Sequence, residues 1–400
     1  MPRENGGRGA AKAAATPAAR GAKSRAAVVE AIGRKDGSIP STVGLDLFDT
    51  LSTMGHEQLV LCHDESCGYR GIIAIHSTTL GPALGGTRFW QYATSDEAIV
   101  DALRLARGMT YKNAVAGLNL GGGKSVIIGD NKTSRRELIF RAHGRFVESL
   151  GGRYITAEDV GTSTHDMDFV HMDTDHVAGL AGRSGDPSPV TAHGVFRSIQ
   201  ASAKHRWGSD SLDGKTISIQ GCGHVGFYLA KELCTAGAKL IVTDIDAERV
   251  RKVVTECGAK AVALDEIYGV KADIFAPCAM GGIINDTTLP RLKVEIVAGA
   301  ANNQLLEPRH GDELEEKEIL YAPDYVANAG GVINVYGELA GWDASRALRQ
   351  AAEIYDTVLH VFEIAKQDGI PTYQAADRLA ERRLKGVGTL VRTWPDTPRK

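Results

Sequence analysis

The pattern of hydrophobic and polar positions predicts an α/β chain from about residue 41 onward. "EQLVLCHD" and "RGIIAIHS" alternate like two strands around a polar turn, and "KSVIIGD" reads as a third strand. Between them, Ile99, Leu103 and Ala106 recur at helical spacing, after a polar N-cap region that includes Thr94. A helix over "SDEAIVDALRLARGMTYKNAVAG" is therefore expected, with Lys112 directed inward near its end.

A second strand, helix and strand pattern carries a glycine motif. "KTISIQ" precedes "GCGHVG", a helical pattern runs to about Ala236, and "KLIVTD" ends in Asp244, 18 residues beyond Gly226. The motif alone is weak, but in this context it predicts a dinucleotide site, with a merely structural βαβ unit as the alternative. Its glycines allow a tight turn, close approach of the pyrophosphate, and packing of the helix on the strand. The candidate cofactor-binding residues of this loop are Gly221, Gly223, His224, Val225 and Gly226.

Asp244 favours one cofactor over the other. Its carboxylate can accept hydrogen bonds from the ribose hydroxyls and would repel a 2'-phosphate. We therefore expect NAD rather than NADP.

Two glycine runs each precede a cation. Gly121–Gly123 lead directly to Lys124, and Gly85 and Gly86 come shortly before Arg88. Adjacent glycines cost backbone entropy, which predicts that another group approaches the chain closely there. A lysine is costly to bury without a partner, so Lys112 and Lys124 at the two ends of an apolar stretch are candidates for substrate binding. The alternative for Lys112 is a packed stem with its ammonium in water.

Composition limits the class of protein. With 400 residues, 43% of them hydrophobic and 24% charged, the chain is long enough for about two domains. A net charge of -3 does not favour nucleic acid, and no apolar run approaches the ~20 residues of a membrane helix. Six cysteines indicate a reducing compartment, and Cys62 and Cys67 fit a hairpin better than a metal site. Residues 1–40 predict a disordered cytoplasmic tail rather than a transit peptide, because they are rich in Ala, Gly and basic residues.

Seven blocks together resemble the amino-acid dehydrogenases of the glutamate/leucine/phenylalanine/valine family, collinearly from about residue 41 to 392. The blocks are "GPALGGTRFW", "RLARGMTYKNAVAGLNLGGGKSVIIGD", "YITAEDVGTSTHDMD", "QGCGHVG", "APCAMGGIIN", "VAGAANNQL" and "YAPDYVANAGGVINV". The resemblance implies a substrate domain over 41–185, a Rossmann domain over 186–339, a cleft between them, and C-terminal helices at about 340–392 that return to the first domain. It also implies a homo-oligomer.

The resemblance further implies reversible, NAD-dependent oxidative deamination of an L-amino acid to a 2-oxo acid and ammonia. By matching positions, Lys112 would hold the substrate carboxylate, Lys124 would be the catalytic base, and Asp159 would exchange protons with the amino group. Desolvation and a neighbouring cation would depress the pKa of Lys124 toward that of a general base. Without its context, Asp159 would be interpreted as a helix N-cap.

Other positions are implied for the substrate pocket. Gly85 and Gly86 would leave room for the substrate backbone, and Asn302 or Asn303 would approach the nicotinamide ribose or the substrate. The side-chain pocket would be walled by Leu84, Ala157, Val332 and Val335. This wall has no cation for a second carboxylate and is closed by small aliphatic groups, which favours leucine, valine and isoleucine. Phenylalanine or another aromatic substrate is the alternative, and a non-catalytic sensor is a further one that the intact lysines and aspartate oppose.

Overall fold

The computed structural model of the chain describes residues 45–183 and 185–390. It divides into two compact units, Met1–Gly55 and His56–Lys400. In the first unit the structure describes one helix, α2 (Leu47–Met54), and the predicted N-terminal tail lies outside the described residues. No helix within the described ranges is long and apolar enough to cross a membrane.

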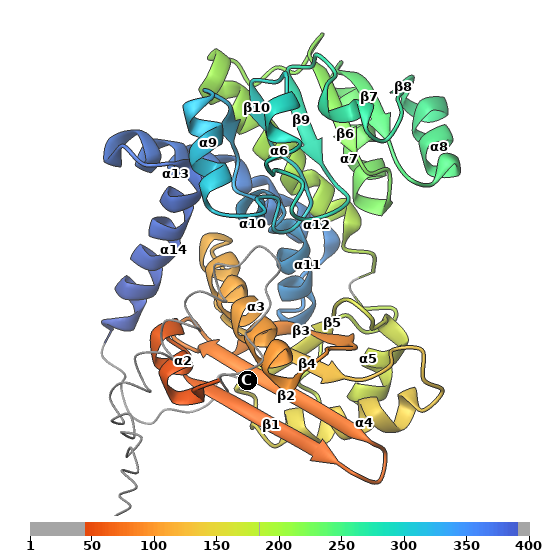
Figure 1. Cartoon of the computed structure of the whole chain (residues 1–400), viewed down its shortest axis with the longest axis vertical. Coiled ribbons are helices and arrows are strands. Elements are labelled where there is room, and N and C mark those ends of the chain that lie inside the picture. The colour runs from red at the N-terminus through yellow and green to blue at the C-terminus, as the bar shows by residue number, and fades with distance from the viewer. Residues whose placement is uncertain (1–44, 184, 391–400) are drawn as a thin grey trace, which may run out of the picture. The chain divides into compact units, whose positions relative to one another are not determined.

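The second unit contains a mixed sheet of five strands in the order β1-β2-β4-β3-β5 (Figure 1). β1 pairs with β2 and β2 with β4 in antiparallel fashion, whereas β3 is parallel to both β4 and β5. The hairpin predicted around the polar turn is confirmed. The strands are β1 (Gln58–Asp64), β2 (Tyr69–Ser77), β3 (Ala83–Trp90), β4 (Gly121–Ile128) and β5 (Tyr154–Glu158).

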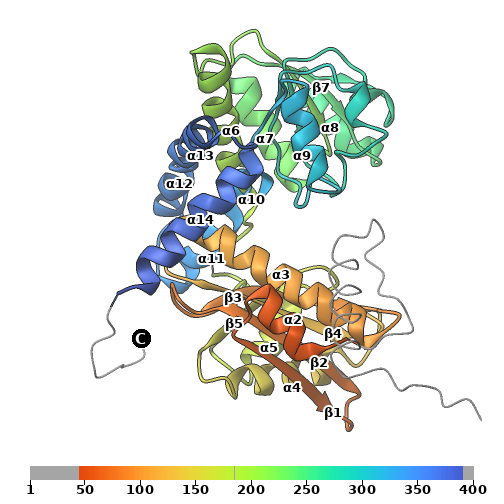
Figure 2. The ribbon, with the colours of Figure 1, turned by 60° about the vertical axis from the view of Figure 1, so that its left-hand side comes forward.

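Helices cover both faces of this sheet. Figure 2 shows α3 (Ser95–Val115) on one face, and α4 (Arg136–Glu148) and α5 (Thr164–His171) on the other. The predicted helix is confirmed as α3. Thr94 is its N-cap, and the Thr94 side chain accepts a hydrogen bond from the Glu97 amide at 3.1 Å. Ile99, Leu103 and Ala106 are buried, as their helical spacing predicts.

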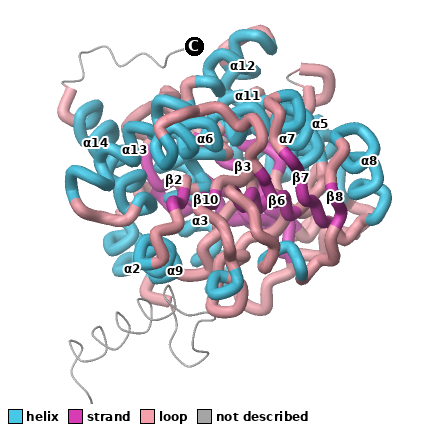
Figure 3. The backbone as a smooth tube through the Cα atoms, turned by 90° about the horizontal axis from the view of Figure 1, so that it is seen from above, coloured by secondary structure: helices cyan, strands magenta, loops and turns pink. Residues whose placement is uncertain are grey.

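A second sheet has six parallel strands in the order β11-β10-β9-β6-β7-β8. Counted from β6, this is the strand order 3-2-1-4-5-6 of a dinucleotide-binding fold, with its switch point between β6 and β9. Figure 3 shows β6, β7 and β8 side by side. The strands are β6 (Thr216–Gln220), β7 (Lys239–Thr243), β8 (Lys260–Ala261), β9 (Ile274–Pro277), β10 (Ile296–Val297) and β11 (Leu320–Tyr321).

Two groups of helices surround the second sheet. The face with Ile217, Ile219 and Val242 shares a hydrophobic cluster with α6 and α7, whereas Phe275 and Val297 pack with α9 and two 3-10 turns. These elements are α6 (Ser188–Trp207), α7 (His224–Thr235), α8 (Ala247–Cys257), α9 (Arg309–Glu316), η1 (Glu266–Tyr268) and η2 (Leu289–Arg291).

The C-terminal helices contact two different parts of the chain. α14 lies against α3, but α12 and α13 lie against α6, which falls in the predicted Rossmann domain. The C-terminal segment was expected to return to the first domain. Its helix α14 does so, whereas α12 and α13 contact the predicted Rossmann domain. The helices are α10 (Asp324–Ala327), α11 (Gly330–Leu339), α12 (Ala344–Ala352), α13 (Ile354–Asp368) and α14 (Thr372–Gly388).

The triple glycine Gly121–Gly123 forms the start of β4 rather than a loop. A Cβ placed on Gly122 would lie 2.1 Å from the backbone nitrogen of Thr110 in α3, and one on Gly85 would lie 1.7 Å from the Gly123 carbonyl oxygen. The group that approaches these glycines is therefore the chain itself. Close packing of α3, β3 and β4 explains the glycines without a bound substrate.

We predict opposite effects for two glycine to alanine substitutions. Gly85→Ala should lower the free energy of unfolding by about 1–3 kcal/mol or more, because the methyl group has no space beside β4. Gly108→Ala should raise it by about 0.4–1 kcal/mol, because that helical position is exposed and has nothing within 4 Å of the new Cβ. Urea denaturation followed by circular dichroism measures both. A Gly85→Ala protein as stable as the wild type would contradict the packing described here.

Candidate functional site

Lys124 forms a buried ion pair with Asp159. The lysine lies in β4 with 4% of its surface exposed, and its Nζ is 2.8 Å from Asp159 Oδ2. Asp159 directly follows β5, and β3 pairs with both β4 and β5, so the sheet brings the two residues together. Both were predicted as catalytic residues from the sequence.

Arg88 is a second cation on the same carboxylate. Its Nε donates to Asp159 Oδ2 at 3.0 Å, and its Nη1 donates to Asp101 Oδ2 at 2.8 Å. The hydroxyl of Tyr92 donates to the same Asp101 oxygen at 2.6 Å. The sequence showed Arg88 only as a cation after a glycine pair, because its partners lie on two other segments.

Burial and charge determine the protonation of this pair. Burial alone would raise the pKa of Asp159, but Lys124 and Arg88 beside it hold that pKa below the usual aspartate range. Burial lowers the pKa of Lys124, the Asp159 carboxylate opposes that shift, and Arg88 adds to it. The pair thus combines an ionised carboxylate with an amine that releases its proton more readily than a surface lysine.

The interpretation of Asp159 as a helix N-cap is wrong. The N-cap of α5 is Ser163, which forms a capping box with Asp166. Asp159 contributes its backbone to the preceding turn, where its amide donates to Thr162 Oγ1 at 2.8 Å. Its carboxylate is therefore left for Lys124 and Arg88.

Lys112 reaches the loop that follows β10. The lysine is half-buried in the last turn of α3, and its Nζ donates to Asn302 Oδ1 at 3.3 Å. The same oxygen accepts a hydrogen bond from Asn328 Nδ2 at 2.8 Å. Burial lowers the pKa of Lys112 to about 8, opposed by the carboxylate of Asp324. That carboxylate accepts from the Gln304 amide at 2.7 Å, which holds the loop against α10.

The structure distinguishes the two neighbouring asparagines. Asn302 directs its side-chain oxygen to Lys112, as described above. Asn303 has a φ of +52°, in the left-handed region that asparagine tolerates, and its carbonyl accepts from the Gly282 amide at 2.7 Å. Asn303 therefore bends the backbone of this loop, and both asparagines are exposed.

The four predicted pocket residues are aliphatic and mostly buried. Leu84 and Val332 belong to one hydrophobic cluster, and half-buried Val335 packs against it. Ala157 pairs with Gly86 in the ladder between β3 and β5. A Cβ on Gly86 would lie 2.3 Å from the Glu158 carbonyl oxygen, so the approach of β5 also accounts for this glycine.

The glycine motif forms a tight turn between β6 and α7. Gly221 has a φ of +106°, and a Cβ on Gly226 would lie 2.0 Å from the Gly221 carbonyl oxygen. Gly223 is the N-cap of α7 and makes no side-chain cap, which leaves amide groups of the first turn available to an anion. Exposed His224 and half-buried Val225 begin the helix.

Asp244 holds this turn through both oxygens of its carboxylate. Its Oδ2 accepts from the Cys222 amide at 2.6 Å, and its Oδ1 accepts from the Asp246 amide at 2.8 Å. Each carboxylate oxygen has a second lone pair, so Asp244 can still accept from a ribose hydroxyl. Together with the open N-terminus of α7, these residues fit a dinucleotide.

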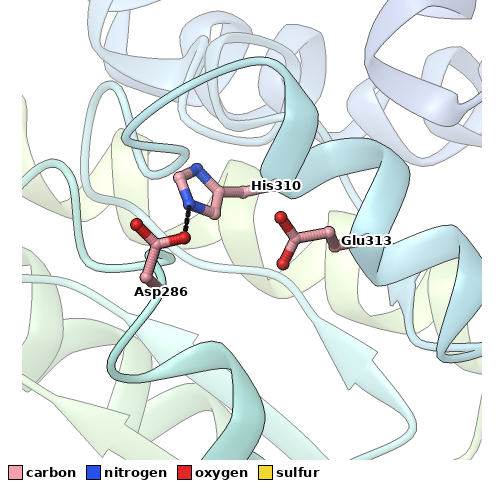
Figure 4. A group of neighbouring side chains, drawn as sticks. All are labelled: Asp286, His310 and Glu313. Atoms are coloured by element: carbon pink, nitrogen blue, oxygen red, sulfur yellow. Dashed lines mark hydrogen bonds and ion pairs between the residues drawn. The ribbon is translucent and has the colours of Figure 1, made fainter. Parts of the chain in front are cut away.

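Asp286, His310 and Glu313 form a group that could suit a metal ion by residue type (Figure 4). Arg309, however, bridges both carboxylates, with Nη2 2.6 Å from Asp286 Oδ1 and Nη1 2.8 Å from Glu313 Oε1. A metal ion would have to compete with this guanidinium, so we assign the group to an ion-pair network.

A cavity of about 600 Å³ lies at the amino ends of the strands of the second sheet, whereas the glycine turn lies at the carboxyl end of β6. It is lined by residues at the amino ends of the strands, including Thr216, Asp273 and Glu295. Parallel α/β sheets bind ligands at the carboxyl ends of their strands, so this cavity is not our candidate site.

Comparison with known proteins identifies similar chains along most of this sequence. Residues 56–176 match the Glu/Leu/Phe/Val dehydrogenase dimerisation domain, and residues 241–385 match the Glutamate/Leucine/Phenylalanine/Valine dehydrogenase domain. The leucine dehydrogenase of Geobacillus stearothermophilus is 58% identical over 85% of this chain and 94% of its own. The valine dehydrogenase of Streptomyces albus is 51% identical over 82% and 92%. The crystal structure of L-tryptophan dehydrogenase from Nostoc punctiforme matches with a TM-score of 0.78 and 47% sequence identity, and the match covers 85% of this chain and 99% of that chain.

We predict that Gly223→Ala weakens dinucleotide binding selectively. Its new Cβ would meet only Arg249 Nη1 at 3.9 Å, so the free energy of unfolding measured without cofactor should change by less than about 1 kcal/mol. A pyrophosphate close to this backbone would meet the methyl group, and the Kd for NADH from titration calorimetry should rise about tenfold or more, which corresponds to ~1.4 kcal/mol. Gly226→Ala is the matched control and should lose stability as well. An unchanged Kd for Gly223→Ala would place the phosphates elsewhere.

Proposed function

Because the chain belongs to the glutamate/leucine/phenylalanine/valine dehydrogenase family, we propose that it catalyses the reversible, NAD-dependent oxidative deamination of branched-chain L-amino acids to 2-oxo acids and ammonia. As a member of this family it is an oxidoreductase, and the family and the Rossmann-type sheet imply a nicotinamide dinucleotide. The leucine and valine dehydrogenases reported above support the branched-chain substrate class.

The buried contact between Lys124 and Asp159 supports this chemistry most directly. In the direction of deamination, Asp159 accepts a proton from the substrate ammonium, which frees the nitrogen lone pair. A bound nicotinamide dinucleotide would supply the acceptor for the hydride that leaves the substrate Cα. Lys124 then takes a proton from the water that adds to the resulting imine carbon, and collapse of that adduct releases ammonia and the 2-oxo acid. Lys124 can do so because burial lowers its pKa.

Lys112 provides the charge that orients the substrate. Its ammonium lies at the end of α3, within hydrogen-bond distance of Asn302, and it can form a charge-assisted bond to the substrate carboxylate. Binding of that carboxylate favours the protonated form, which offsets the effect of burial on the pKa of Lys112. We assign Asn302 a place beside the substrate carboxylate, and Asn303 the role of shaping the loop.

The remaining proposals concern the whole chain. We propose a homo-oligomer, because residues 56–176 match a dimerisation domain. We also propose a cytoplasmic location and the boundaries predicted for the substrate domain (41–185) and the Rossmann domain (186–339). A non-catalytic sensor would bind an amino acid without turnover, and the assays below distinguish the two functions.

We predict that Lys124→Ala lowers kcat by about 10²- to 10⁴-fold, because the general base is lost. The Kd for NADH should stay near the wild-type value, since the glycine turn lies on another sheet. The wild-type kcat/KM should rise with pH as Lys124 loses its proton, with a midpoint below the ordinary lysine value, and this limb should be absent in the variant. Lys132→Ala, an exposed lysine, is the control. A variant that keeps more than about a tenth of kcat would exclude Lys124 as the base.

We predict that leucine, isoleucine and valine are the best substrates, separated by about 10- to 200-fold in kcat/KM. Glutamate should be poor, because Leu84, Ala157, Val332 and Val335 offer no partner for a second carboxylate. Ala157→Gly should raise relative activity on phenylalanine, because it removes a methyl group from the pocket wall. NADH absorbance with each amino acid, tryptophan included, measures these ratios. A wild-type preference for an aromatic substrate or glutamate would overturn the substrate class but not the chemistry.

We predict that NAD is preferred over NADP. Asp244 directly follows β7, and its carboxylate would repel a 2'-phosphate while accepting from the ribose hydroxyls. The ratio of kcat/KM with NAD to kcat/KM with NADP should fall in Asp244→Ser. Since Asp244 also holds the Cys222 amide, Asp244→Asn serves as a second variant that keeps an acceptor oxygen without the charge. Equal use of both cofactors by the wild type would contradict the assignment.

A further inference from the structure

A buried network of polar side chains lies on the face of the first sheet opposite Lys124. Thr87 Oγ1 is 2.7 Å from Ser125 Oγ and 3.0 Å from His143 Nε2, and it also bonds Thr156 Oγ1. His143 Nδ1 is 2.8 Å from the Tyr69 hydroxyl. All five side chains are fully buried. The network thus links three neighbouring strands to α4 and β2.

Three strand residues of this network are each the chain neighbour of a residue in the proposed site. Successive side chains of a strand point to opposite faces. A hydrogen bond that fixes a side chain on one face therefore also fixes the position of its neighbour on the other face. Thr87 precedes Arg88, Ser125 follows Lys124, and Thr156 precedes Ala157. A network that fixes its own three strands therefore also fixes the positions of the site residues.

Backbone pairing between β3 and β4 is interrupted close to this network. The paired residues pass from Leu84 and Gly122 to Thr87 and Ser125, with no pair at Gly85. At that gap, the hydroxyl of Tyr154 in β5 lies 2.5 Å from the Gly85 carbonyl oxygen of β3 and 3.1 Å from Ser125 Oγ of β4. Side-chain hydrogen bonds thus hold the strands together where the regular ladder is absent.

The surroundings of the network make its polarity costly. The cluster around it contains Phe89, Phe140 and Ile127, and hydroxyl groups in such a place cost free energy unless they are paired. Burial lowers the pKa of His143 to about 3, so the ring stays neutral and has one donor and one acceptor nitrogen. An unpaired hydroxyl or ring nitrogen would cost free energy here, so the stable arrangement of the strands is the one in which all of these groups are hydrogen-bonded.

We propose that Thr87, Ser125 and His143 are positioning residues that set the distance between Lys124 and Asp159 from the opposite face of the sheet. Their effect on catalysis rests on the proposed function. Their effect on Lys124 itself does not, because it can be measured without turnover.

The first experiment compares two serine to alanine variants. Ser125→Ala removes a network hydroxyl, and Ser202→Ala removes an equally buried hydroxyl that donates to Ser198 within α6. We expect kcat of Ser125→Ala to fall by about ten- to a hundredfold, because a shift of ~1 Å in a catalytic group can cost ~10² in rate. The Kd for NADH should not change, and Ser202→Ala should keep its kcat. Thr87→Val should lose kcat, and Thr87→Ser should restore most of it.

The second experiment reads the position of Lys124 directly. The rate of acetylation at Lys124 is measured against pH by peptide mass spectrometry in the wild type and in each variant, well below the unfolding temperature. A longer contact with Asp159 weakens the attraction that keeps the proton on Lys124, so the midpoint should move to lower pH in Ser125→Ala and Thr87→Val. The midpoint should not move in Ser202→Ala.

The outcomes separate the two hypotheses. Lower thermal stability with unchanged kcat and unchanged acetylation of Lys124 in Ser125→Ala and Thr87→Val would overturn the positioning role. A wild type without turnover on any amino acid would refute the proposed function, and the acetylation midpoints would still decide the positioning proposal.

Discussion

The contact between Lys124 and Asp159 is the interaction on which the proposed chemistry depends. A buried ammonium is unfavourable without a partner, and here the partner is one carboxylate oxygen at 2.8 Å that Arg88 also contacts. Two cations on a single carboxylate keep it ionised, while burial favours proton release from the lysine. The contact thus stabilises the buried lysine, while burial and the nearby Arg88 lower the pKa of Lys124 in the direction that its proposed role as a base requires.

Close packing of the backbone makes that contact possible. β3 lies between β4 and β5, and its Gly85 and Gly86 lie close to the backbone of Lys124 and to the side chain of Asp159. Side chains at Gly85 and Gly86 would collide with the carbonyl oxygens of Gly123 and Glu158. The absence of side chains at 85 and 86 lets the strands approach closely, and hydroxyl groups join them on the face opposite Lys124.

Lys112 connects the helix packed on the first sheet to a loop of the parallel sheet. It extends from α3 to Asn302, in the loop that follows β10 of the parallel sheet. Asn328 and Asp324, at the two ends of α10, hold that loop in turn. Polar side chains from distant parts of the sequence thus align the residues proposed for the carboxylate with the sheet proposed for the dinucleotide.

The sequence by itself determined the elements and the chemical types of the site. Periodicity and capping residues act within a few positions, which is why α3 and the hairpin of β1 and β2 were predicted correctly. The glycine motif between β6 and α7 was likewise local, and the resemblance brought Lys112, Lys124 and Asp159 into one site.

Only the tertiary structure decided which atoms meet. Arg88 gained its role from Asp101 and Asp159, and Asp324 from Lys112, because these partners lie far apart in the sequence. The glycines that suggested room for a substrate proved to admit the chain's own strands. Hydrophobic pattern specifies which face of a strand is buried, but the partner across a sheet depends on strand order and register, which form only when the whole chain packs.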